Sequence, residues 1–163
     1  MRLPGHSAYL AGLFNLRKVQ WKNRQLFASS AFSMLEVELN YFDNTNDNFL
    51  IRVETTGITM AGVQNKDSLN IRNIKQYLAL FETFYTNEYI DIGQVPKYDS
   101  LLKTNPIAVI RVKDMYKHAS KEIEIYSIPQ DKYYVLKENN NDISICEKKR
   151  FQKFLIRNKQ RLY

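Results

Sequence analysis

Alternating apolar and polar residues dominate the first third of the chain and predict antiparallel strands. Leu35, Val37, Leu39 and Tyr41 alternate with Met34 and three polar residues, which is typical of a strand with one solvated face. A turn-forming cluster of Asp, Asn and Thr occupies residues 43–48, and a second alternating run covers residues 49–54. Gly57 ends that run, and residues 58–64 form a weaker third one. These runs predict a three-stranded meander.

Residues 70–90 follow a different period. Ile71, Ile74, Leu78, Phe81 and Tyr85 are spaced by three or four residues, which places them on one face of a helix. The side chain of Ser68 or Asn70 can cap its first turn by accepting a bond from an unpaired backbone N–H group. The pattern predicts one long amphipathic helix that buries this stripe against the sheet.

The second half returns to strand patterns. Residues 99–103 favour one helical turn, and residues 107–112, 121–128, 132–138 and 142–147 favour strands. Phe151, Phe154 and Leu155 have the spacing of a short closing helix. The order βββ-α-βββ(β) predicts an α+β fold: an antiparallel sheet with one long helix packed on one face, plus short terminal helices. We expect one domain over residues 1–163, with an irregular N-terminal wrap (1–30), a sheet-plus-helix core (31–147) and a basic C-terminal helix or tail (148–163).

The positive charge is concentrated at the two ends of the chain. The 163 residues carry a net charge of +7, with five Lys or Arg and no acid in residues 1–30 and seven and no acid in residues 148–163. Solvated termini explain this distribution most simply. Binding of the basic ends to an anionic membrane surface or to another polyanion is the alternative.

Catalytic and metal-binding patterns are weak. Asp43, Asp47 and Glu54 occupy three positions of a calcium-binding loop, but Asn48 replaces its glycine and both flanks are strand-like. The chain has two histidines, His6 and His118, and one cysteine, which disfavours a zinc site or a hydrolytic triad. We therefore expect no enzyme activity and no cofactor, and an enzyme of unknown type stays an open alternative.

Aromatic residues make up 13% of the chain and suggest an interaction surface. Trp21 is expected to fill the core or cover the sheet. The basic C-terminal run either closes the sheet or lies on an anionic membrane. An RNA-recognition sheet is disfavoured, because neither its element order nor its aromatic strand motif is present. The candidate binding surface comprises Tyr126, Tyr133, Tyr134, Lys148, Lys149, Arg150, Phe151 and Phe154.

Several packing and turn residues share a pattern with one bacterial family. They are Leu3-Pro4-Gly5, Tyr9-Leu10, Phe14, Trp21-x-x-Arg24, Leu26-Phe27, the alternating run to Tyr41, Tyr77-Leu78, Asp99-Ser100-Leu101 and Pro106. With these residues the chain resembles the C-terminal half of a domain-of-unknown-function family of envelope-associated proteins, whose members have a membrane anchor followed by tandem βββ-α-ββ units. The given residues match only the second unit, so the resemblance implies that Met1 opens a fragment or a reduced member of the family. Lys22 stands where the family has an Arg directly after the Trp.

The resemblance implies a fold and a location but no catalytic residues. It implies a periplasmic or cell-envelope protein, whereas a chain complete as given would be cytoplasmic. The leading hypothesis is a non-catalytic interaction module that binds another protein. The alternative is binding of a membrane surface or polyanion through the basic termini, with nucleic acid the less favoured of the two. The sequence leaves the oligomeric state open.

Overall fold

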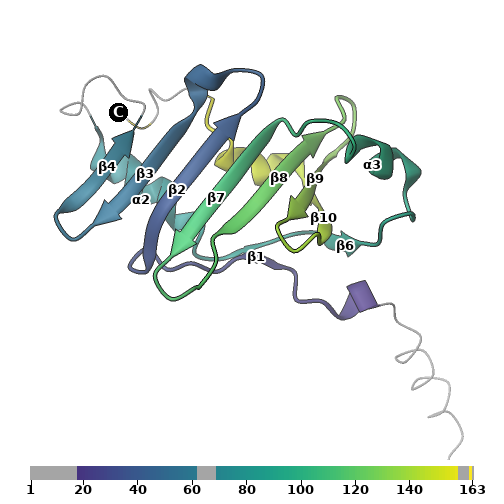
Figure 1. Ribbon diagram of the computed structural model, residues 1–163, viewed down its shortest axis with the longest axis horizontal. Coiled ribbons are helices and arrows are strands. Elements are labelled where there is room, and N and C mark those ends of the chain that lie inside the picture. Colours follow the sequence, from purple (N-terminus) through teal and green to yellow (C-terminus); the bar gives the residue numbers. More distant parts are fainter. Residues whose placement is uncertain (1–17, 62–68, 158–161, 163) are drawn as a thin grey trace, which may run out of the picture.

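The computed structural model describes residues 18–61, 69–157 and 162. Its main feature is an eight-stranded antiparallel sheet with the order β4-β3-β2-β7-β8-β9-β10-β6 (Figure 1). The strands are β2 (Met34–Tyr41), β3 (Phe49–Glu54), β4 (Gly57–Ala61), β6 (Glu88–Ile90), β7 (Ala108–Asp114), β8 (Lys121–Ser127), β9 (Tyr133–Glu138) and β10 (Ile143–Glu147). The mixed, mostly antiparallel α+β class predicted from the sequence is confirmed.

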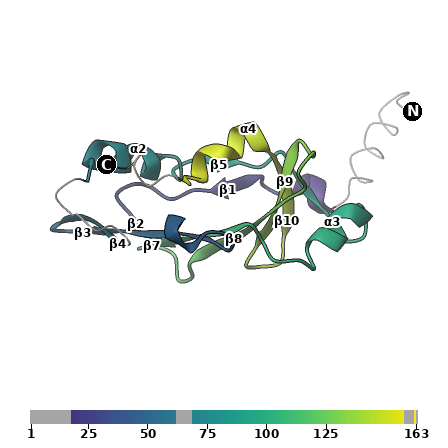
Figure 2. The same ribbon diagram turned by 90° about the horizontal axis from the view of Figure 1, so that it is seen from above.

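A second layer covers one face of this sheet. It contains α2 (Ile71–Ala79), α4 (Lys148–Phe151), the 3-10 turn η4 (Gln152–Phe154) and a two-stranded ribbon of β1 (Gln25–Phe27) and β5 (Phe84–Tyr85) (Figure 2). We call it the helical layer. Two further 3-10 turns, η1 (Lys18–Trp21) and η2 (Thr45–Asp47), lie in connections.

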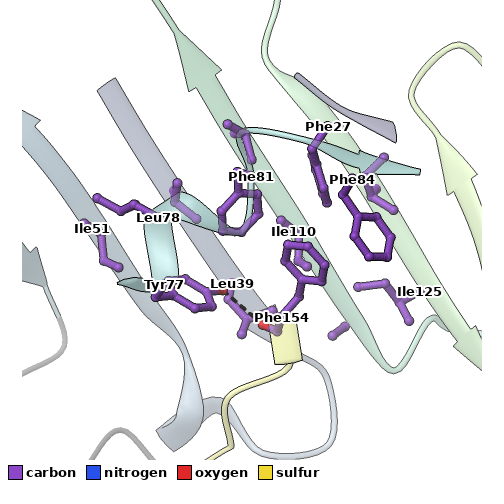
Figure 3. Close-up of a cluster of buried hydrophobic side chains, with 14 of the residues drawn as sticks. Phe27, Leu39, Ile51, Tyr77, Leu78, Phe81, Phe84, Ile110, Ile125 and Phe154 are labelled. Carbon is purple, nitrogen blue, oxygen red and sulfur yellow. Dashed lines mark hydrogen bonds between the residues drawn. The ribbon is translucent and has the colours of Figure 1, made fainter. Parts of the chain in front are cut away.

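A cluster of phenylalanines fills the space between the two layers (Figure 3). The ring of Phe154 lies 5.3 Å from that of Phe27, 5.0 Å from that of Phe81 and 4.8 Å from that of Phe84, measured between ring centroids. The Tyr77 hydroxyl donates a hydrogen bond of 3.0 Å to the carbonyl oxygen of Phe154. The segment around Phe154 is therefore part of the core.

The opposite face of the sheet is covered at one end by α3 (Pro96–Leu101). Tyr98 of this helix belongs to a separate apolar cluster with Tyr126, Val135, Ile143 and Ile145. Val135 is directly opposite Tyr126 on β8 and Ile145 on β10, so these side chains share a face. Leu136, the next residue, belongs to the main core.

The prediction of a single long helix over residues 70–90 is wrong, because the observed helix is shorter. The helix starts as expected, with Asn70 accepting a hydrogen bond from the backbone N–H of Asn73, but it ends at Ala79. Phe81 is still fully buried beyond that end, whereas Tyr85 is 46% exposed. The β-branched and aromatic residues 83–86 favour extended backbone, and β5 pairs with β1 there.

Other details of the predicted order also change. The structure adds β1, β5 and β6, so the order βββ-α-βββ(β) is incomplete. An irregularity between Met34 and Glu36 buries Met34 and leaves Leu35 half-buried, which reverses the expected orientation at the start of β2. Trp21 is 63% exposed and does not fill the core. The predicted cap Ser68, His6 and the N-terminal motifs before residue 18 lie outside the described residues.

Candidate functional site

Three residues of the predicted binding surface are buried, which corrects that prediction. Phe151 and Phe154 are fully buried in the main core, because α4 and η4 turn their apolar side toward the sheet. Tyr126 is buried in the cluster beneath α3, and its hydroxyl donates a 2.6 Å hydrogen bond to Oε2 of Glu124. None of the three can contact a partner without unfolding its surroundings.

Tyr133, Tyr134 and Lys148 are half-buried and support the end of β9 and β10. The two tyrosines are consecutive in one strand, so they point to opposite faces of the sheet. Lys148 Nζ donates a 2.6 Å hydrogen bond to the carbonyl oxygen of Ile128 and lies 5.5 Å from the centre of the Tyr134 ring. These three residues therefore do not form one exposed surface.

Lys149 and Arg150 are exposed, and Arg150 shares the hydrogen-bond partner Asn87 with Arg24. Arg150 donates hydrogen bonds to Oδ1 of Asn87 at 3.1 Å and to the carbonyl oxygen of Tyr85 at 2.9 Å. Arg24 donates a 2.9 Å hydrogen bond to the carbonyl oxygen of the same Asn87. Two guanidinium groups from opposite ends of the sequence are thus oriented by one asparagine.

Backbone contacts hold Asn87 in place. Its N–H donates to the carbonyl oxygen of Ile145 at 3.0 Å, and its Oδ1 also accepts from the N–H of Glu147 at 3.0 Å. The neighbouring Thr86 N–H donates to the carbonyl oxygen of Arg24 at 2.9 Å, next to the pairing of β1 with β5. Strand pairing therefore positions the two guanidinium groups before any ligand arrives.

Lys153 extends the positive surface. Lys153 Nζ lies 5.4 Å from the centre of the Phe84 ring, and the Arg150 guanidinium carbon lies 5.5 Å from the same centre. We define the basic patch as Arg24, Lys149, Arg150 and Lys153. Within the described part of the chain, none of the four forms an ion pair with a carboxylate.

The uncovered part of the opposite sheet face shows the contrasting arrangement. Arg111 contacts Glu38 at 2.8 Å and Glu122 at 2.6 Å, which links β2, β7 and β8. Arg52 pairs with Glu36 at 3.1 Å, and Lys137 pairs with Glu124 at 3.1 Å. These charged side chains neutralise each other, whereas the four of the basic patch have no such partner among the described residues.

The basic patch influences two neighbouring titratable groups. Lys132 chiefly lowers the pKa of Glu147, and Arg150 and Lys149 lower it further. Burial raises the pKa of the Cys146 thiol to about 11, although Arg150 and Lys153 oppose this shift. The thiol is therefore protonated at neutral pH and is a poor nucleophile.

The remaining chemical candidates are not brought together. His118 is exposed in the loop between β7 and β8. The calcium-loop interpretation fails, because Asp43 pairs with Arg157 at 2.8 Å and the six-residue strand β3 carries Glu54 away from Asp43 and Asp47. Among the described residues, no group of three or more His, Cys, Asp or Glu side chains could hold a metal ion. The helices in this part of the chain are all too short or too polar to cross a membrane.

Sequence reasoning missed Arg24, Lys153 and Asn87 as members of one site. Lys153 lies in the basic run that was recognised, but Arg24 joins it only through the unpredicted pairing of β1 with β5. Comparisons with protein-family models, curated proteins and solved structures give no match. The resemblance to the envelope-associated family stays a prediction.

Proposed function

We propose that the protein is a non-catalytic interaction module that binds an acidic segment of a partner protein through the basic patch. The main support is the pair of guanidinium groups held on Asn87 without a carboxylate partner among the described residues. Like charges held close together repel each other, and a bound anion offsets that repulsion. The site is therefore best suited to a negatively charged ligand.

The hydrogen-bonding geometry supports recognition of carboxylates. A guanidinium group is planar and carries five N–H donors, so Arg24 and Arg150 keep free donors after their bonds to Asn87 and Tyr85. Those bonds limit the rotation of both side chains, which reduces the entropy lost on binding. Tyr85, whose carbonyl oxygen accepts a hydrogen bond from Arg150, is 46% exposed and offers an apolar contact for a peptide.

An acidic protein fits the patch better than a nucleic acid does. Nucleic-acid domains neutralise several phosphates along a basic groove or stripe, usually with exposed aromatic rings that stack on bases. Here only two guanidinium groups meet at one residue, Asn87, and Phe84, the ring near Arg150 and Lys153, is buried. Binding of a polyanion or of an anionic membrane is the alternative, and the same experiment distinguishes them.

The test compares two double variants with equal loss of charge. Arg24→Gln with Arg150→Gln removes both guanidinium groups, whereas Lys103→Gln with Lys113→Gln removes two exposed charges that form no ion pair among the described residues. Binding of a fluorescent poly-glutamate peptide is measured by anisotropy between 50 and 200 mM salt, with single-stranded RNA and phosphatidylserine vesicles as competing probes.

The patch variant should bind poly-glutamate about tenfold more weakly, since two exposed charge pairs contribute roughly 1–2 kcal/mol together. The control should stay within about twofold of the wild type. Equal losses in both variants would show non-specific attraction by net charge. Tighter binding of RNA or of vesicles than of the peptide would support the corresponding alternative.

Envelope location is a separate proposal that rests on the resemblance. Fractionation of bacteria expressing the complete reading frame tests it, because an envelope protein should be recovered with the periplasm or membranes. Recovery of the intact product in the cytosol alone would refute it.

A further inference from the structure

Phe32 is the most exposed large apolar side chain of the described residues, at 97%. It lies in a tight turn just before β2, where the N–H groups of Ser33 and Met34 both donate to the carbonyl oxygen of Ser30 at 3.0 Å. Ser33 Oγ also donates to the buried carboxylate of Asp114 at 2.8 Å. These bonds hold the side chain of Ser33 toward the protein, where it is buried, and the Phe32 ring is left in solvent.

A groove lies directly beside this ring. It has a volume of about 460 Å³ and is formed by the turn that contains Phe32, the hairpin between β3 and β4, and α2. Val53, Ile58 and Leu78 supply apolar walls, and Glu54 and Lys75 line it with opposite charges. Neither charged side chain has an ion-pair partner within the described ranges.

We propose that two copies of the chain form a two-fold symmetric dimer, in which Phe32 of each copy inserts into the groove of the other. A two-fold interface brings the same surface of both copies together, so it requires a surface that is complementary to itself. Phe32 and its neighbouring groove provide a protruding ring and an apolar recess on one surface. Glu54 and Lys75 provide opposite charges there, so Glu54 of each copy meets Lys75 of the other.

The size of the surface predicts a weak dimer. Two further exposed apolar residues, Met115 and Tyr116, follow β7, and the Met115 N–H donates to the carbonyl oxygen of Ser33 at 2.8 Å. Figure 1 shows the loops before β2, after β3 and after β7 along one edge of the molecule. Three large side chains at roughly 150–250 Å² each amount to about 900–1,500 Å² for two copies, around or below the lower end of the range of about 1,200–2,000 Å² typical of stable complexes. We expect a weak dimer, with a dissociation constant in the micromolar to millimolar range.

Sedimentation equilibrium over a concentration series tests the proposal. Phe32→Ser should weaken the dimer at least tenfold, because it removes both inserted rings. Phe42→Ser is the matched control, since Phe42 is 58% exposed just after the other end of β2 and should leave association unchanged. Both changes replace exposed rings, and circular dichroism should show the wild-type fold for each.

Charge reversal tests whether Glu54 of one copy faces Lys75 of the other. Glu54→Lys and Lys75→Glu alone place like charges against each other and should each weaken the dimer several-fold. The double variant restores opposite charges across the interface and should recover most of the loss. A monomer at all concentrations up to about 1 mM, a dimer insensitive to Phe32→Ser, association beyond two copies, or no recovery in the double variant would each overturn the proposal.

Discussion

Replacement of Phe154 by alanine tests whether the basic C-terminal segment is part of the core. The Phe154 ring is fully buried and contacts the rings of Phe27, Phe81, Phe84 and Phe151. Truncation of such a residue removes its transfer free energy and leaves a cavity that neighbouring rings fill only in part. We expect the free energy of unfolding to fall by about 3–5 kcal/mol.

Urea denaturation followed by far-UV circular dichroism measures this loss. Dichroism is preferred to fluorescence, because Trp21 is 63% exposed and its emission should change little on unfolding. For a chain of this size, 1 kcal/mol corresponds to about 2–4 °C, so the melting temperature should fall by roughly 10 °C. The change in midpoint should occur with little change in slope.

Lys153→Ala is the matched control for the same segment. Lys153 is exposed and contacts the rings of Phe84 and Phe154 only through its charged end, so its removal should cost less than about 1 kcal/mol. A Phe154→Ala loss below about 1 kcal/mol, or one no larger than the control, would refute the assignment of this segment to the core. Such a result would return Phe154 to the surface where the sequence placed it.

Two further predictions concern buried polar groups. Lys121→Met breaks the ion pair with Glu138, whose side chain is 3% exposed, and should lower the free energy of unfolding by about 3 kcal/mol. Lys132→Met breaks the exposed pair with Glu147 and should lower it by less than about 1 kcal/mol. Equal losses for the two variants in urea denaturation would contradict this prediction. Burial alone would raise the pKa of Asp114, but hydrogen bonds, one of them from Ser33, outweigh burial and lower it. A lowered folded-state pKa stabilises the protein above the unfolded-state value of about 4, and this contribution disappears as the pH falls through the folded-state pKa. Asp114→Asn should therefore reduce the loss of stability between pH 6 and pH 3. An unchanged pH dependence would refute the lowered pKa of Asp114 in the folded protein.

The sequence predicted the strands with one solvated face well. In β2 the residues from Glu36 to Tyr41 alternate between half-buried and buried, and Phe49 and Ile51 are buried as expected in β3. A period of two is a local property, so it can be recognised without knowing the neighbouring strand. At Leu35 this reasoning fails, because the irregular pairing with β7 depends on a strand more than 70 residues away in sequence.

The end of the central helix depended on long-range pairing. Phe81 is buried just beyond the helix, so its spacing from Leu78 imitates another helical turn. What ends the helical pattern is the pairing of Phe84 and Tyr85 with Gln25 and Phe27. A three-residue strand such as β1 gives almost no periodic signal, so neither partner could be recognised from the sequence.

The candidate site was predictable only in part for the same reason. The basic run could be recognised in the sequence. Either its phenylalanines or its basic residues could face solvent, and the choice depends on which side of α4 meets the sheet. Burial of both phenylalanines places the charges outward. No sequence pattern marks Asn87 as part of the site, because its role depends on hydrogen bonds from Arg24 and Arg150, which are distant in sequence.

The two layers of the fold also explain why basic side chains without carboxylate partners gather at one place on the surface. On the open sheet face, residues directly opposite each other are close enough to pair, and Arg111 lies between Glu38 and Glu122 on adjacent strands. On the helical layer, Arg24, just before β1, and Arg150 of α4 do not lie on paired strands, and they meet only at Asn87. Attraction of an anion should therefore depend on residues at Asn87 far more than on the total charge of +7.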